Sequence, residues 1–291
     1  MSGRTPIERH AQARGYDLAY WEWPGEGTPV LLIHGIGLHG RTWDPLVDAL
    51  PDGTRVIAPD LRGHGRSEIP APKDEHLWWG ELGEDVAALL DAIDLPPVLG
   101  VGHSMGGHSL IFTAAAAPSR FASLLLFDPT AGDPERARIP EPLENDAAVA
   151  RRRNDWASPD EMYERFAGRP PFQTWHPAAL RAYCDYGLVP NGDRFALACP
   201  PALEATIWGG MSPGLYDAIA TIEAPVHIVR AEPRTSDQPP GFTPSQTWPG
   251  LVDYFARGSD ELLAGRGHFF ALESPEVAAA FIVRALSRIA A

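Results

Sequence analysis

The sequence contains few of the features that mark secreted, metal-binding or membrane proteins. Its 291 residues include only two cysteines, Cys184 and Cys199, whose spacing matches no metal-ligand pattern. We expect two buried free thiols in a reducing compartment. The N-terminal segment has no apolar core of a secretory signal, and no window approaches the roughly 20 apolar residues that a membrane span needs. These absences predict a cytoplasmic protein.

Positive charge is also scarce. The chain carries 24 Lys and Arg against 38 Asp and Glu, for a formal net charge of -14. Nucleic acids and anionic membranes attract positive surfaces, so we expect neither as a partner. The one basic run, at residues 151–153, is typical of a solvated helix face. A small-molecule substrate is the expected partner, and the sequence leaves a homo-oligomer open.

Continuous apolar runs that stop at Gly, Pro or Asp recur along the chain. They predict strands that are buried on both faces, at residues 29–35, 54–60, 96–104, 122–129 and 224–232. Helical patterns separate these runs, and a hairpin that turns at Gly15 precedes them. Alternating strands and helices indicate right-handed crossovers and a mostly parallel sheet with helices on both faces.

Residues 133–222 break this alternation. They show no strong strand pattern, and they combine helix candidates with proline-rich turns and dense aromatic residues. We interpret them as a helical cap inserted into a core domain formed by residues 1–132 and 223–291. The aromatic side chains predict either a small core or the lining of an apolar pocket. The candidates for substrate contact are Trp175, His176, Tyr183 and Trp208.

The segment 102–106, Gly-His-Ser-Met-Gly, matches the G-x-S-x-G pattern between a predicted strand and a predicted helix. A serine on such a tight turn has strained backbone angles, and side chains at the flanking glycines would clash. Ser104 is therefore the predicted nucleophile. The N–H groups of Met105 and of Ile36, in the earlier segment IHGIG, are predicted to hold the oxyanion.

His268 is the predicted base among the ten histidines. It lies on a loop after the last predicted strand and before the last helix. In a doubly wound sheet this loop reaches the same C-terminal edge as Ser104. We expect structural roles for His34, His64 and His103, which lie beside glycine turns.

Four segments, IHGIG, APDLRGHGRSE, GHSMGG and GRGHF, occur in an order and spacing that resemble the α/β-hydrolase superfamily over nearly the whole chain. The resemblance implies an α/β fold with a mostly parallel eight-stranded sheet, flanked by helices, and a helical cap inserted after the sixth strand. It also implies a Ser-acid-His triad in that chain order. It implies no particular substrate, because many chemistries share this fold.

The acid of the triad is the member that departs from the usual pattern. Most members of the superfamily carry it after the strand that follows the cap, where this chain has Pro233 and Arg234, with Glu232 just before and Asp237 later. A second arrangement, similar to that of zearalenone lactonases, places the acid before the cap. That position is Asp128. An aspartate is common there even without a catalytic role, but a triad histidine needs an ionised partner.

We therefore predict Asp128 as the acid, with Asp237 or Glu232 as the alternative. The complete set predicts a hydrolase of carboxylic esters or lactones that needs no cofactor or metal and acts on a largely apolar or aromatic substrate. Carbon–carbon bond hydrolysis of a diketone-like substrate and cofactor-free perhydrolysis would use the same triad. A ligand-binding receptor on this fold is the alternative from another class.

Overall fold

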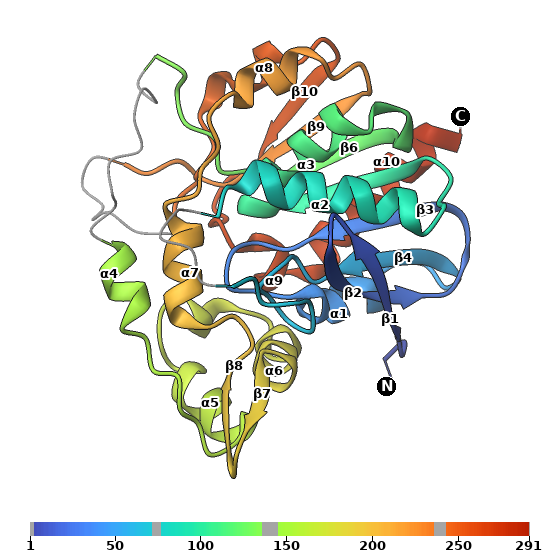
Figure 1. The fold of residues 1–291 in the computed structure, drawn as a ribbon. Helices are drawn as coiled ribbons and strands as arrows, with labels where there is room; N and C mark the ends of the chain where they lie inside the picture. Colours follow the sequence, from blue (N-terminus) through green and yellow to red (C-terminus); the bar gives the residue numbers. More distant parts are fainter. Residues whose placement is uncertain (1–2, 72–76, 136–144, 236–242, 291) are drawn as a thin grey trace.

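One eight-stranded sheet forms the centre of the molecule (Figure 1). The computed structural model describes residues 3–71, 77–135, 145–235 and 243–290. The strand order is β1-β2-β4-β3-β5-β6-β9-β10. The strands are β1 (Ile7–Ala13), β2 (Tyr16–Trp23), β3 (Glu26–Ile33), β4 (Thr54–Pro59), β5 (Val98–His103), β6 (Phe121–Phe127), β9 (Val226–Arg230) and β10 (Gly258–Leu262).

The sheet is mostly parallel, as predicted. Among the described residues of this sheet, β2 is the one strand that runs opposite to the others, so it pairs antiparallel with β1 and β4. The predicted turn at Gly15 joins β1 to β2, and the five apolar runs form β3, β4, β5, β6 and β9. Strand β10 was not predicted, because it is an edge strand with mostly exposed side chains and therefore carries no apolar run.

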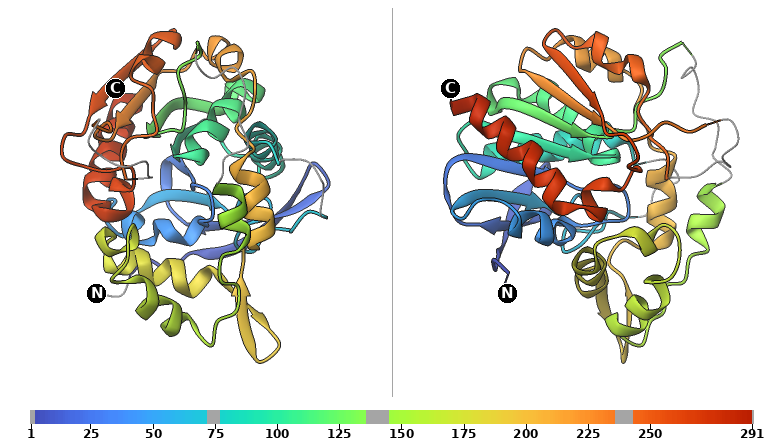
Figure 2. Two further views of the ribbon diagram at one scale, coloured as in Figure 1. Left: turned by 90° about the vertical axis from the view of Figure 1, so that its left-hand side faces the viewer. Right: turned by 180° about the vertical axis from the view of Figure 1, so that it is seen from behind.

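Helices cover both faces of the sheet (Figures 1 and 2). Because successive strand side chains point to opposite faces, Leu124 of β6 belongs to the apolar cluster that contains side chains of α2 and α3, whereas Leu125 belongs to the cluster that contains side chains of α10. This double burial explains the continuous apolar runs. The helices on the sheet are α1 (Asp44–Asp48), α2 (Trp79–Ala92), α3 (Met105–Ala116), α8 (Leu215–Ala220), α9 (Phe270–Glu273) and α10 (Pro275–Ala290). The 3₁₀ helices of the described residues are η1 (Gly40–Trp43), η2 (Pro118–Arg120), η3 (Phe172–Thr174) and η4 (Pro249–Tyr254).

Between β6 and β9 the chain leaves the sheet and forms a separate layer of short elements (Figure 1). These elements are α4 (Asn145–Ala150), α5 (Pro159–Phe166), α6 (Pro177–Tyr186), β7 (Leu188–Asn191), β8 (Arg194–Leu197) and α7 (Pro201–Trp208). The β7–β8 hairpin corrects the expectation of a region without strands. Each of its strands has only four residues and is partly exposed, so neither carries a strong apolar pattern.

An apolar cluster, separate from those on the two faces of the sheet, stabilises this layer and connects it to the core. Trp156, Met162 and Leu180 of the layer pack in one cluster with Leu38 and Leu272. In contrast, α8 also lies between β6 and β9 but packs on α3. The boundaries of core and cap at residues 133 and 222 remain a prediction.

The two cysteine thiols are free and buried, as predicted. Burial raises the pKa of the Cys184 thiol to about 12, so it stays protonated and unreactive at neutral pH. Within the described residues, no helix combines the length and the apolar character that crossing a membrane would require.

The substitution Gly106→Ala tests the close contact of α3 with β3. A Cβ at Gly106 would lie 2.4 Å from the carbonyl oxygens of Ile33 and His34, so the helix would have to move away from the strand. We expect the free energy of unfolding to fall by about 1–3 kcal/mol. Gly168→Ala, whose added Cβ meets nothing within 4 Å, is the control. Urea unfolding measures both, and equal stability of the two variants would contradict the packing described.

Candidate active site

Ser104 occupies a strained turn between β5 and α3. Its φ is 57° and its ψ is -125°, angles that are uncommon for a residue other than glycine. Its amide donates a hydrogen bond to the carbonyl of Phe127 on the neighbouring strand, at 3.1 Å. A Cβ at Gly102 would lie 2.6 Å from the carbonyl oxygen of Gly106. The turn therefore depends on these two glycines, and it presents the serine hydroxyl at the first turn of α3.

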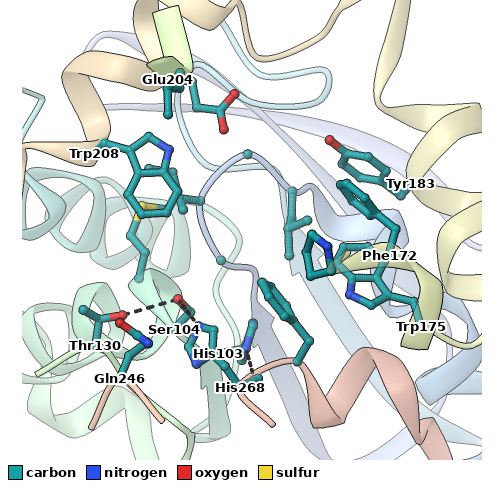
Figure 3. Close-up of a pocket in the computed structure, with 18 of the residues that line it drawn as sticks. His103, Ser104, Thr130, Phe172, Trp175, Tyr183, Glu204, Trp208, Gln246 and His268 are labelled. Atoms are coloured by element: carbon teal, nitrogen blue, oxygen red, sulfur yellow. Dashed lines mark hydrogen bonds between the residues drawn. The ribbon is translucent and has the colours of Figure 1, made fainter. Parts of the chain in front are cut away.

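His268 connects Ser104 to Asp128 through two hydrogen bonds. Its Nε2 lies 2.9 Å from the Oγ of Ser104 (Figure 3), and its Nδ1 lies 2.6 Å from the Oδ2 of Asp128. Because an ionised carboxylate only accepts, the Nδ1–H donates to Asp128, which leaves Nε2 to accept the serine proton. Asp128 is fully buried and His268 is 3% exposed. The structure thus brings together the three residues that the sequence singled out.

Donors from segments that follow β9 in the chain hold the carboxylate of Asp128. Its Oδ1 accepts from the amide of Ala231, and its Oδ2 accepts from the amide of Gln246, both at 2.9 Å, while the Ser245 hydroxyl also donates to Oδ1. Burial raises the pKa of this carboxyl, but His268 and these donors outweigh burial and lower the pKa below its usual value. Asp128 is therefore ionised at neutral pH.

The alternative acids do not occupy this position in the described residues. Glu232 is exposed, and its carboxylate accepts a hydrogen bond from the amide of Gly265 at 2.9 Å. Asp237 lies outside the residues that the structure describes. Of the three candidates, Asp128 is the one whose contact with His268 is described.

Ile36 and Met105, whose amides are the predicted oxyanion donors, line the same cavity as Ser104. In the described part of the chain, neither amide donates a hydrogen bond to another protein group. Met105 is the first residue of α3, where a helix leaves its N–H groups free. The loop that carries Ile36 is fixed by Gly37, whose φ of 69° favours glycine and whose amide donates to His64. Both amides are therefore available to an anion beside Ser104.

Other histidines hold the surrounding loops in place. The Nε2 of His64 accepts a hydrogen bond from Gly37 at 3.2 Å, and the Nε2 of His103 donates to the carbonyl of His268 at 2.8 Å. His34 contacts the carbonyl of Gly35 through Nδ1 at 2.8 Å. These contacts match the structural roles expected for the three histidines.

A cavity of about 320 Å³ opens above Ser104 (Figure 3). Trp175, Tyr183 and Trp208 line it, as expected for contacts to a substrate. The expectation for His176 is wrong: its side chain is exposed, and its Nδ1 accepts a hydrogen bond from the amide of Ala178 as the N-cap of α6. Proximity to Trp175 in the sequence did not place it at the cavity.

Four polar residues of the cavity were not singled out from the sequence. Thr130 lies 3.3 Å from the Ser104 hydroxyl, and Gln246 lines the cavity beside it. Arg152 and Glu204 form an ion pair in the cavity wall. The expectation that residues 151–153 form a solvated helix face is wrong for Arg152. The run follows the end of α4, and the side chain of Arg152 lines the cavity. No local pattern marks the other three residues.

Buried histidines predict a steep loss of stability in mild acid. Burial lowers the pKa of five of them in the folded state, to about 4 for His64 and His108, about 3 for His39 and His103, and below the ordinary value for His34. In the unfolded chain they titrate near 6.5. Below pH 6.5 the unfolded state therefore binds protons that the folded state does not bind. As a result, the free energy of unfolding decreases as the pH falls below 6.5.

We expect each histidine to remove about 1.4 kcal/mol per pH unit below 6.5. The raised pKa values of four carboxyls act in the opposite sense: about 6 for Asp60, and above the ordinary value for Asp44, Asp85 and Glu204. Carboxyls ordinarily titrate near pH 4, so these groups oppose the histidines mainly at the acid end of the range. Urea unfolding at several pH values between 7.5 and 5 measures the slope. A free energy of unfolding that stays constant over this range would contradict the burial of neutral histidines.

Comparison with known proteins agrees with the fold. Residues 30–281 match the model of the alpha/beta hydrolase family. A lipase, LipV of Mycobacterium tuberculosis, is 34% identical over 80% of this chain and 83% of its own length. The 2-(acetamidomethylene)succinate hydrolase of Mesorhizobium japonicum is 30% identical over 72% of each chain. A crystal structure of E-2-(acetamidomethylene)succinate hydrolase superposes with a TM-score of 0.75, 24% identity and coverage of 96% of this chain and 98% of the other. The chain belongs to the alpha/beta hydrolase family.

Proposed function

We propose that this protein is a serine hydrolase that cleaves carboxylic ester or lactone bonds without a cofactor. The observation that carries the proposal is the chain of hydrogen bonds from Asp128 through His268 to Ser104, which ends at an apolar cavity. A similar protein of the family, 34% identical, is a lipase, which supports ester chemistry.

In the first half of the reaction, Ser104 attacks the carbonyl carbon of the bound ester. His268 takes the hydroxyl proton on Nε2, and Asp128 stabilises the imidazolium through the 2.6 Å contact at Nδ1. The negative charge that develops on the carbonyl oxygen is held by the amides of Ile36 and Met105. Fixed amides at a buried site need no reorganisation, so they favour the tetrahedral intermediate over the ground state.

His268 then returns the proton to the leaving alcohol, which departs and leaves the acyl-enzyme. In the second half, His268 takes a proton from a water molecule that attacks the acyl carbon, and it returns this proton to Ser104 as the acid is released. A lactone would follow the same steps, but its alcohol stays attached to the acyl group. Trp175, Tyr183 and Trp208, together with the other aromatic rings of the cavity, suit an apolar or aromatic substrate. A receptor on this fold would bind such a ligand with little turnover.

Replacing Ser104 by alanine is expected to lower kcat/KM for a short p-nitrophenyl ester by about 10⁴-fold or more, because the nucleophile is lost. Ser109→Ala is the matched control: this serine is buried on α3, the helix that follows Ser104, and in the described residues its Oγ has no hydrogen-bond partner. We expect the control to retain wild-type rates. Release of p-nitrophenol at equal rates by wild type and Ser104→Ala would rule out the proposed nucleophile, and release by wild type no faster than in buffer would favour a receptor.

The acid is tested by Asp128→Asn, for which we expect kcat to fall by about 10⁴-fold, because the His268 tautomer is no longer imposed. The amide NH₂ would also replace one of the two carboxylate oxygens and would then face the N–H of either Ala231 or Gln246, so we expect a loss of about 1–3 kcal/mol in stability. Glu232→Gln is the control and is expected to leave both quantities unchanged. Steady-state kinetics and urea unfolding measure the two effects. Near-wild-type kcat in Asp128→Asn, or a large loss in Glu232→Gln, would contradict the assignment.

A further inference from the structure

An ion pair lies in the wall of the cavity, in addition to the polar residues around Ser104. The Nη1 of Arg152 contacts both carboxylate oxygens of Glu204 at 2.5 Å, and its Nη2 lies 3.3 Å from the hydroxyl of Tyr183. All three residues line the cavity that contains Ser104. Figure 3 draws Glu204 and Tyr183 on the side of the cavity away from Ser104 and His268. The cavity therefore has a reactive end and a separate polar end.

The stability of the fold does not account for this pair. Desolvating two charges costs several kcal/mol per ion, and apolar residues of similar volume are often as stable in such positions. The Glu204 side chain is only 4% exposed, while Arg152 is 29% exposed in a residue that borders the cavity. A guanidinium has five N–H donors. In the described residues, three are used by Glu204 and Tyr183, which leaves the Nε–H and one Nη2 hydrogen for a ligand.

The balance of charge at this end selects the kind of ligand. Glu204 neutralises Arg152, so an additional carboxylate on the ligand would be repelled by Glu204 as well as attracted by Arg152. The net charge of -14 on the chain also disfavours an anion. A neutral carbonyl accepts from Arg152, and a hydroxyl both accepts from Arg152 and donates to Glu204. We propose that Arg152 and Glu204 form a polar subsite that binds a neutral carbonyl or hydroxyl group at the far end of an otherwise apolar ester substrate.

The position of Glu204 ties this subsite to the reactive end. A Cβ at Gly37 would lie 2.7 Å from the Oε1 of Glu204, so the carboxylate rests against the loop that carries Ile36. One substrate can thus contact the amide of Ile36 through its reacting carbonyl and Arg152 through its distal group. This subsite rests on the proposed ester hydrolysis, because it defines the far end of that substrate.

The test compares p-nitrophenyl esters of medium-length linear acids that end in a methyl group, a methyl ketone or a carboxylate. We expect wild-type kcat/KM for the ketone to exceed that for the methyl-terminated ester of equal length by about tenfold or more, since a hydrogen bond to a charged group is gained. The carboxylate-terminated ester is expected to be the poorest of the three.

The double substitution Arg152→Met/Glu204→Leu removes both charges together and avoids leaving one of them buried alone. We expect its ratio of kcat/KM for the ketone ester to kcat/KM for the methyl-terminated ester to fall to about one; because the ratio is taken within each variant, a general change in rate cancels. Arg151→Met, one residue away and exposed, is the matched control and is expected to keep the preference. Circular dichroism and thermal unfolding verify that each variant is folded. If the double variant is unfolded, Arg152→Lys is measured instead, and it is expected to reduce the preference because the planar fork of donors is lost.

Three results would overturn the subsite. The first is that wild type hydrolyses the methyl-terminated and ketone esters at equal rates, and the second is that wild type prefers the carboxylate-terminated ester. The third is that the preference for the ketone survives in the double variant, or in Arg152→Lys if the double variant is unfolded. Each of these leaves Ser104-dependent hydrolysis intact, so only the subsite fails. Hydrolysis that is absent with all three esters, or equal in Ser104→Ala, rejects the proposed function itself.

Discussion

The hydrogen bond between Asp128 and His268 is the contact on which the candidate site depends. It joins the end of β6 to a loop that lies 140 residues later in the chain, and it fixes the imidazole against Ser104 on the neighbouring strand. The carboxylate can serve this purpose because Ala231 and Gln246 donate to it from two further segments. A buried charge with this many partners stays ionised, and an ionised carboxylate imposes a single tautomer on the histidine.

The parallel sheet explains why residues so far apart in the sequence meet. Parallel strands end at the same edge, so the residues after β5 and β6 are adjacent as soon as the strands pair. The tight turn at Ser104 then requires glycines rather than a particular side-chain chemistry. The buried histidines around the site form hydrogen bonds with backbone amides and carbonyls of the loops, which have no partner in a strand or helix.

Features determined by local chemistry or by buried strands could be predicted. The apolar runs, the glycine-flanked serine and the position of His268 each leave a strong pattern, and Asp128 followed from the absence of an aspartate at Pro233 and Arg234. Strand β10 and the β7–β8 hairpin could not be recognised, because their exposed side chains follow no apolar alternation. Arg152 lay in a run that looks solvated, but its contacts with Tyr183 and with Glu204, 52 residues later, place it at the cavity. Such pairings depend on tertiary structure, which no local pattern encodes.

The measurement that tests the central claim most directly is the covalent labelling of the protein by a serine-directed organophosphonate, followed by peptide mass spectrometry. The account predicts one adduct on Ser104, formed at a rate that falls sharply in His268→Ala because the hydroxyl is no longer deprotonated. A protein that remains unlabelled, or an adduct on a residue other than Ser104, would contradict it.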